Sequence, residues 1–148
     1  MTLSRTLAAA GAAVLISTAL AGCGSSGSDT LTKAEFQTKA NKLCADANKD
    51  TEAYGKDISE KSTDAEVTEA IDKTVKRNQE LVDAIDGLNE PESISDDVAS
   101  MLDSVRAGMK DLDKISSVQD LMSFDPNGGN FKDANDEANK LGLDTCGQ

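Results

Sequence analysis

The side chains of this chain that could do chemistry are three cysteine thiols and a large number of carboxylates. The 148 residues include 27 acidic and 15 basic side chains, three Cys and no His, which gives a net charge of −12. Without His, the chain lacks the Ser-His-Asp and Cys-His nucleophile systems and every His-containing zinc site. The excess of negative charge also argues against nucleic-acid binding, which needs concentrated Lys and Arg.

The first thiol follows a segment that is typical of export. Residues 1–22 carry one basic side chain and an apolar stretch over residues 7–20, which is too short to span a bilayer but fits a signal peptide. The stretch ends in Leu20-Ala21-Gly22-Cys23, which resembles the lipobox of bacterial lipoproteins at all four positions. The resemblance implies recognition of Leu20, Ala21 and Gly22 by the signal peptidase, cleavage before Cys23, and a diacylglyceryl thioether on Cys23. The alternatives are an ordinary secretory signal followed by a chance Cys, or a buried helix.

The residues after Cys23 predict a flexible tether. Residues 24–29 read Gly-Ser-Ser-Gly-Ser-Asp, a composition typical of flexible linkers. Two or three acyl chains on one Cys give stable membrane anchoring. We therefore expect a signal peptide over 1–22, a lipidated Cys and tether over 23–30, and a folded domain over 31–148. This organisation places the protein on the extracytoplasmic face of the cell membrane, bound to the membrane through the lipid on Cys23.

The two remaining thiols, Cys44 and Cys146, form an even pair in an exported chain. Export implies an oxidising compartment, so a disulfide between them is expected. Redox catalysis is less favoured because the sequence contains no Cys-x-x-Cys motif, and two lone thiols without His make a poor metal site. We therefore predict a structural disulfide, no metal site and no cofactor.

The spacing of apolar residues predicts four helices and no strand in the domain. Two capping boxes, Thr32 with Glu35 and Thr63 with Glu66, begin the first two helices, whose apolar stripes run over residues 36–58 and 67–88. Ser93 or Ser95 is expected to cap the third helix, with its stripe over residues 98–112. After a loop over residues 124–129, a short helix over residues 131–141 is expected to end at a glycine, residue 142, in the left-handed conformation.

These elements predict an all-α fold, an antiparallel bundle of three long helices plus a short C-terminal helix, stapled by one disulfide. Packing of the last helix antiparallel on the first would bring Cys146 beside Cys44. The domain resembles small, uncharacterised helical lipoproteins of high-GC Gram-positive bacteria. The resemblance rests on Phe36, on Ala-Asn-Lys-Leu-Cys at 40–44 and Asn48, on Leu-Asn-Glu-Pro at 88–91, and on residues 138–147. It also implies an envelope location and the same disulfide, but no activity and no binding residue.

Three polar features are candidates for binding or catalysis. Asn78 interrupts the apolar stripe of the second helix and could contact a ligand. We favour the interpretation that it sets the register of the helix or lies at the solvent edge. Between Asn78 and Val105 there are eight acidic residues and no basic one. These acids could bind a basic partner or divalent cations. We favour the alternative that they form a solvated surface. Asp133 and Asp136 could serve as an acid–base pair, but 27 acids produce such pairs by chance.

Three functions remain open on the sequence. The first, favoured by default, is a non-enzymatic interaction module that presents helical faces to an envelope protein partner. The acidic stretch would favour a basic partner. The second is a carrier of a small ligand or lipid with an apolar pocket between helices, although the 3% of aromatic residues weighs against such a pocket. The third is a carboxylate-based hydrolase. We expect no enzyme, because no phosphate loop, dinucleotide fingerprint or nucleophile elbow occurs in the domain.

Overall fold

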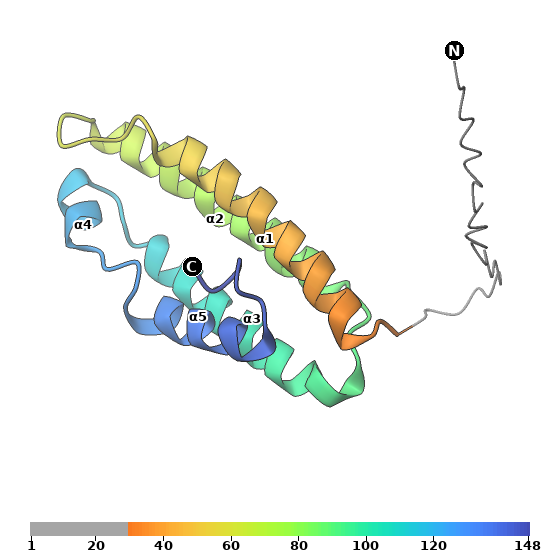
Figure 1. Cartoon of the computed structure of the whole chain (residues 1–148). Coiled ribbons are helices and arrows are strands. Elements are labelled where there is room, and N and C mark those ends of the chain that lie inside the picture. The colour runs from red at the N-terminus through yellow and green to blue at the C-terminus, as the bar shows by residue number, and fades with distance from the viewer. Residues whose placement is uncertain (1–29) are drawn as a thin grey trace, which may run out of the picture.

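The protein folds as a bundle of helices in the computed structural model, which describes residues 30–148 (Figure 1). Five helices and no strand occur in this part of the chain, so the predicted all-α class is confirmed. None of these helices is long and apolar enough to cross a membrane. The helices in chain order are α1 (Lys33–Gly55), α2 (Asp64–Asp86), α3 (Glu92–Leu112), α4 (Val118–Ser123) and α5 (Gly129–Leu141).

Both predicted capping boxes are confirmed. The hydroxyl of Thr32 accepts a hydrogen bond from the backbone N–H of Glu35 at 3.3 Å, and the Glu35 carboxylate accepts one from the backbone N–H of Thr32 at 2.9 Å. Thr63 and Glu66 make the same exchange at 3.3 and 2.7 Å. Each exchange pairs two backbone donors that the helix itself cannot use, and so fixes where α1 and α2 begin.

These bonds predict an acid-sensitive contribution to stability. The Thr32 hydroxyl also donates a hydrogen bond to the Glu35 carboxylate at 2.7 Å, and this bond above all holds the pKa of Glu35 below its ordinary value of 4.5. The pKa of Glu66 is likewise lowered, mainly by the hydrogen bond from the backbone N–H of Thr63. A lowered pKa in the folded state stabilises the protein above the ordinary pKa, and this stabilisation is lost as the pH falls through the lowered value. The doubly substituted variant Glu35→Gln/Glu66→Gln should therefore show a smaller fall in melting temperature than the parent between about pH 5 and pH 3.

The matched control for that measurement is Glu52→Gln/Glu60→Gln. Both of these side chains are exposed and accept no hydrogen bond from a described residue. The control should keep the acid sensitivity of the parent, as followed by circular dichroism. Equal acid sensitivity in the parent and in the capping-box variant would contradict the prediction.

Two local predictions are corrected by the structure, and one helix was missed. The third helix has Pro91 at its N-cap without a side-chain cap, and Ser95 instead donates back to the carbonyl of Glu92 at 3.1 Å, so neither Ser93 nor Ser95 caps it. The first helix ends at Gly55, so Ile58 lies beyond it. Helix α4 was not predicted. It is six residues long and begins after a Ser117 cap, and it is too short to carry a long apolar stripe.

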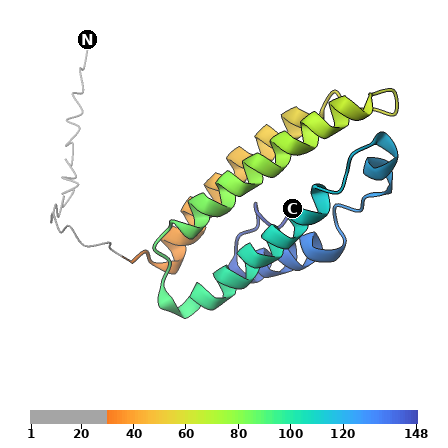
Figure 2. The ribbon, with the colours of Figure 1, turned by 180° about the vertical axis from the view of Figure 1, so that it is seen from behind.

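The helices form two antiparallel pairs that are joined through α2 and α3 (Figures 1 and 2). One pair is α1 with α2. The other is α3 with α5, where the Glu137 carboxylate accepts hydrogen bonds from Ser100 at 2.8 Å and Ser104 at 3.0 Å. Packing of the last helix on the first, the arrangement considered above for bringing the cysteines together, does not occur, and the small face of α5 packs closely on α3 instead. A Cβ at Gly108 of α3 would lie only 2.8 Å from the ring of Phe131.

The apolar core consists of two separate clusters. The larger one fills the end where the two pairs meet, and its buried residues are Phe36, Ala40, Cys44, Val82, Ile85, Ile94, Val98, Met101, Leu102, Met109, Ala138, Leu141 and Leu143. The smaller one lies at the opposite end, beside α4, and consists of Val67, Ile71, Leu112 and Ile115. Partly buried side chains, among them Phe124 and Phe131, pack against the smaller cluster. The two pairs of helices are therefore held together at both ends.

Candidate functional site

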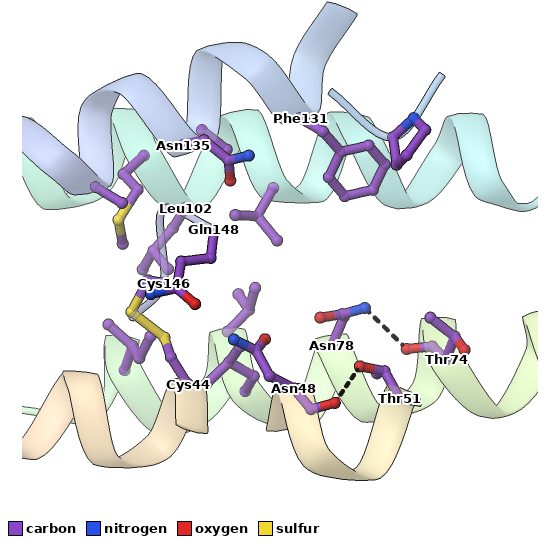
Figure 3. Close-up of a pocket in the computed structure, with 18 of the residues that line it drawn as sticks. Cys44, Asn48, Thr51, Thr74, Asn78, Leu102, Phe131, Asn135, Cys146 and Gln148 are labelled. Atoms are coloured by element: carbon purple, nitrogen blue, oxygen red, sulfur yellow. Dashed lines mark hydrogen bonds between the residues drawn. A yellow bond between two sulfur atoms is a disulfide. The ribbon is translucent and has the colours of Figure 1, made fainter. Parts of the chain in front are cut away.

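A cavity of about 320 Å³ lies between the two clusters, with the α1/α2 pair on one side and the α3/α5 pair on the other (Figure 3). Its walls include Val82 and Leu102 from the larger cluster and Leu112 from the smaller one. Among its lining residues, Asn48, Pro126 and Gln148 are exposed, so the cavity opens to solvent. At about 30 Å³ per water in the liquid, this cavity has room for about ten waters. It is therefore a candidate binding site rather than a packing defect.

The lining of the cavity is apolar with a few neutral polar groups and contains no charged side chain. Its apolar residues are Leu81, Val82, Ile85, Met101, Leu102, Val105, Leu112, Phe124, Pro126, Phe131, Ala134 and Ala138, together with the two cysteines. Its polar residues are Asn48, Thr51, Thr74, Asn78, Asn135 and Gln148. This composition matches that of small-molecule sites, in which a few polar groups orient a mostly apolar ligand.

The polar side chains are only partly used by hydrogen bonds within the protein. Asn78 donates to the carbonyl of Thr74 at 3.1 Å, and the Thr51 hydroxyl donates to the carbonyl of Asn48 at 3.0 Å. The side-chain oxygen of Asn78 accepts no hydrogen bond from a described residue, and the half-buried amide of Asn135 makes none with any of them. These two amides can therefore pair with a molecule in the cavity.

The predicted disulfide between Cys44 and Cys146 is confirmed, with an S–S distance of 2.04 Å, and it forms part of the cavity wall. Sequence reasoning missed the amide side chains of α1 that hold the segment after α5. Gln37 donates to the carbonyl of Leu141 at 2.6 Å, and Asn48 donates to that of Thr145 at 3.0 Å.

Asn41 completes this clamp from the middle of the same face of α1. It donates to the carbonyl of Gly142 at 3.2 Å and accepts from the backbone N–H of Thr145 at 2.9 Å. Gly142 ends α5 with a φ of 77°, as the sequence predicts, and so turns the chain toward α1. The signal in the sequence was the spacing of Gln37, Asn41 and Asn48, which places three amides on the helix face beside Cys44.

The remaining candidate residues do not form a site with this cavity. The lipobox residues Leu20, Ala21, Gly22 and Cys23 lie outside the described residues. Within residues 30–148, no group of three or more Cys, Asp or Glu side chains could hold a metal ion. Asp136 forms an ion pair with Lys132, whose hydrogen bond lowers the pKa of Asp136. This carboxylate has a structural partner and lies outside the cavity lining, so nothing links it to Asp133 as an acid–base pair.

The acidic stretch between Asn78 and Val105 is spread over the end of α2, the turn and most of α3. Its carboxylates are exposed, apart from the half-buried Glu90. The guanidinium of Arg106, one residue beyond the stretch, lies 2.9 Å from the carboxylate of Asp103 and 3.9 Å from that of Asp86. None of the eight acids lines the cavity.

Comparison with known proteins leaves the function to be argued from this geometry. No protein-family model, curated protein or solved structure matches the chain. The lipobox and the resemblance to helical lipoproteins of high-GC Gram-positive bacteria therefore stay predictions from the sequence.

Proposed function

We propose that this protein is a lipid-anchored component of the cell envelope that binds a small, largely apolar molecule in the cavity between its two helix pairs. The observation that carries the proposal is the lining of the cavity. None of its twenty residues has a charged side chain, although 28% of the residues in the chain do. The volume of about 320 Å³ falls at the lower end of the range of about 300–1,000 Å³ that is typical of ligand pockets.

The cavity changes the order of the hypotheses that the sequence leaves open. A ligand carrier was the second choice, because the chain has few aromatic residues. Two of its three Phe side chains, Phe124 and Phe131, nevertheless line the cavity, with their ring centroids 6.0 Å apart in an edge-to-face arrangement. No surface feature in residues 30–148 favours a protein partner to the same degree, so the interaction module stays a prediction.

The proposed anchor would keep this cavity close to a source of apolar molecules. An extended chain covers at most about 3.6 Å per residue, so eight residues from Cys23 to position 30 would reach about 29 Å. A carrier on such a tether exchanges its ligand with the membrane or with a neighbouring envelope protein. It performs no covalent chemistry.

Binding of a neutral fluorescent probe tests the proposal. N-phenyl-1-naphthylamine fluoresces strongly once it leaves water, and it should bind residues 30–148 saturably at a single site. This part of the chain contains the five described helices, both core clusters and the disulfide, so we expect it to fold without residues 1–29. Ala134 lines the cavity, and Ala134→Leu should fill part of it and weaken binding at least about tenfold, an effect of about 1.4 kcal/mol.

Ala99→Leu is the matched control for this substitution. Ala99 lies on α3 with its side chain exposed, so the same added volume stays outside the cavity and probe binding should equal that of the parent. Absence of saturable binding, or equal binding by the parent and Ala134→Leu, would overturn the proposed function.

A further inference from the structure

The disulfide lies at the open side of the cavity. Figure 3 shows the exposed residues Asn48 and Gln148 beside the Cys44–Cys146 bridge. All four residues belong to the lining. A thiol compound in solution can therefore approach the bridge from the solvent side of the cavity.

The two sulfurs of the bridge differ in accessibility. Cys44 is 2% exposed and is part of the larger core cluster, whereas Cys146 is only partly buried and packs against that cluster. A thiolate breaks a disulfide by attack on one of its sulfurs, and access to that sulfur helps to set the rate. Attack on Cys146 is therefore favoured over attack on Cys44.

The bridge also ties the last described residues to α1. The last backbone groups that α1 holds by hydrogen bonds are those of Thr145, through Asn41 at 2.9 Å and Asn48 at 3.0 Å. Beyond Thr145, the backbone hydrogen bonds run back to Leu143 and to α5. Within the described part of the chain, residues 146–148, which we call the rim, are thus joined to α1 by the disulfide and by no backbone or amide hydrogen bond.

We propose that the bridge is a redox-sensitive latch on the cavity. Reduction by an external dithiol, which attacks Cys146, frees the rim and speeds release of the bound molecule. This inference rests on the proposed function and adds a means of regulating the same cavity.

The structure indicates why reduction would loosen the rim and keep the fold. Leu143 is fully buried in the larger cluster, so the chain before the rim stays attached to the core. Between Leu143 and the rim, only the bonds of Asn41 and Asn48 to Thr145 would then hold the chain to α1. Water can replace such bonds at a modest net cost, so this wall of the cavity would open more often.

The exchange is balanced between the protein and the dithiol. A thiolate of the dithiol bonds to the Cys146 sulfur, the bond between the two cysteine sulfurs breaks, and Cys44 leaves as a thiolate that takes up a proton. The second thiol of the dithiol loses its proton and attacks the first, which releases Cys146 as a thiolate that is protonated in turn. The dithiol has then supplied two electrons and become a disulfide.

Release of N-phenyl-1-naphthylamine from residues 30–148 tests the effect on the cavity. Its dissociation rate is measured by stopped-flow dilution, with the bridge intact and after reduction by dithiothreitol without oxygen. Reduction should raise this rate at least about tenfold and leave the helical circular dichroism signal unchanged in the cold. Cys44→Ser/Cys146→Ser should release the probe as fast as the reduced parent, with or without dithiothreitol.

Ile94→Ala is the control for a general loss of stability. Ile94 is buried in the larger cluster but lies outside the cavity lining, so this variant is destabilised with the bridge intact. It should release the probe at the rate of the parent, and Ile94→Val takes its place if Ile94→Ala is not folded. Release as fast as from the reduced parent would overturn the latch.

A monothiol locates the attacked sulfur. Glutathione, added to the oxidised protein in about equal amount, can form a mixed disulfide but cannot resolve it. After an acid quench and alkylation of free thiols, peptide mass spectrometry should find the glutathione on Cys146 and the alkyl group on Cys44. Equal amounts of glutathione on the two cysteines, or more on Cys44, would overturn the assignment of Cys146.

The latch and the proposed function fail in different ways. Saturable probe binding with the same release rate before and after reduction would overturn the latch and leave the proposed function standing. Absence of saturable binding in the oxidised parent would overturn the proposed function, and the latch with it.

Discussion

Replacement of both cysteines in Cys44→Ser/Cys146→Ser should lower the melting temperature by roughly 15–20 °C. The disulfide joins residues 102 positions apart, for which the chain-entropy model gives about 4.7 kcal/mol. Domains are stable by only about 5–15 kcal/mol, and 1 kcal/mol corresponds to about 4 °C in a domain of this size. The division of the core into two clusters adds to the dependence on the bridge, because no single apolar core runs along the whole length of the bundle.

Thermal unfolding followed by circular dichroism measures this effect. The variant should keep its helical signal when cold, because the capping boxes and the Gln37, Asn41 and Asn48 bonds remain. Parent protein that has been reduced and alkylated should melt close to the variant. Titration with a thiol reagent in denaturant gives an independent check, and two reactive thiols in the untreated exported domain would contradict the prediction.

Cys23→Ala should abolish incorporation of radiolabelled palmitate. Cys44 and Cys146 are consumed by the disulfide, so Cys23 is the one thiol of the chain left to accept a diacylglyceryl group. Label is measured in cells that express the parent or the variant, and the unlipidated precursor should also stay uncleaved or be misprocessed. Ser25→Ala, two residues after Cys23, is the matched control and should keep the label. Equal labelling of parent and Cys23→Ala would end the lipoprotein interpretation.

The elements that depend on local sequence could be predicted. Thr32 with Glu35, and Thr63 with Glu66, define helix starts within four residues, so the structure confirms both boxes. The disulfide could be predicted because the sequence predicts export and leaves two cysteines beyond the predicted lipobox, which allow one pairing. Helix α4 could not be predicted, because its six residues are too few to show an apolar period.

The cavity depends on tertiary geometry that the sequence does not express locally. The stripe of the last helix, with Ala134 and Ala138, fits either α1 or α3, and the close approach at Gly108 decides in favour of α3. With α5 on α3, a space opens opposite α1 and α2. Asn78 looks like an ordinary polar interruption until that space is seen, and its position in the lining now favours the ligand-contact interpretation as a proposal.

The clamp on the last residues was missed for a related reason. Gln37 and Asn41 lie beside the apolar stripe of α1, where amide side chains usually face water. Their partners are backbone groups more than one hundred positions away in sequence. Pairing of a side chain with a distant backbone leaves no signature in residue types, so the sequence could indicate the cysteine partner but not the amides around it.

The bridge between α1 and the end of the chain also makes a covalent ring of residues 44–146. Every connection between the described helices lies inside this ring. A protease that cuts one of these connections produces two fragments that remain joined through sulfur. If Cys23 carries lipid, a single such cut in the envelope would therefore release none of the five helices from the membrane.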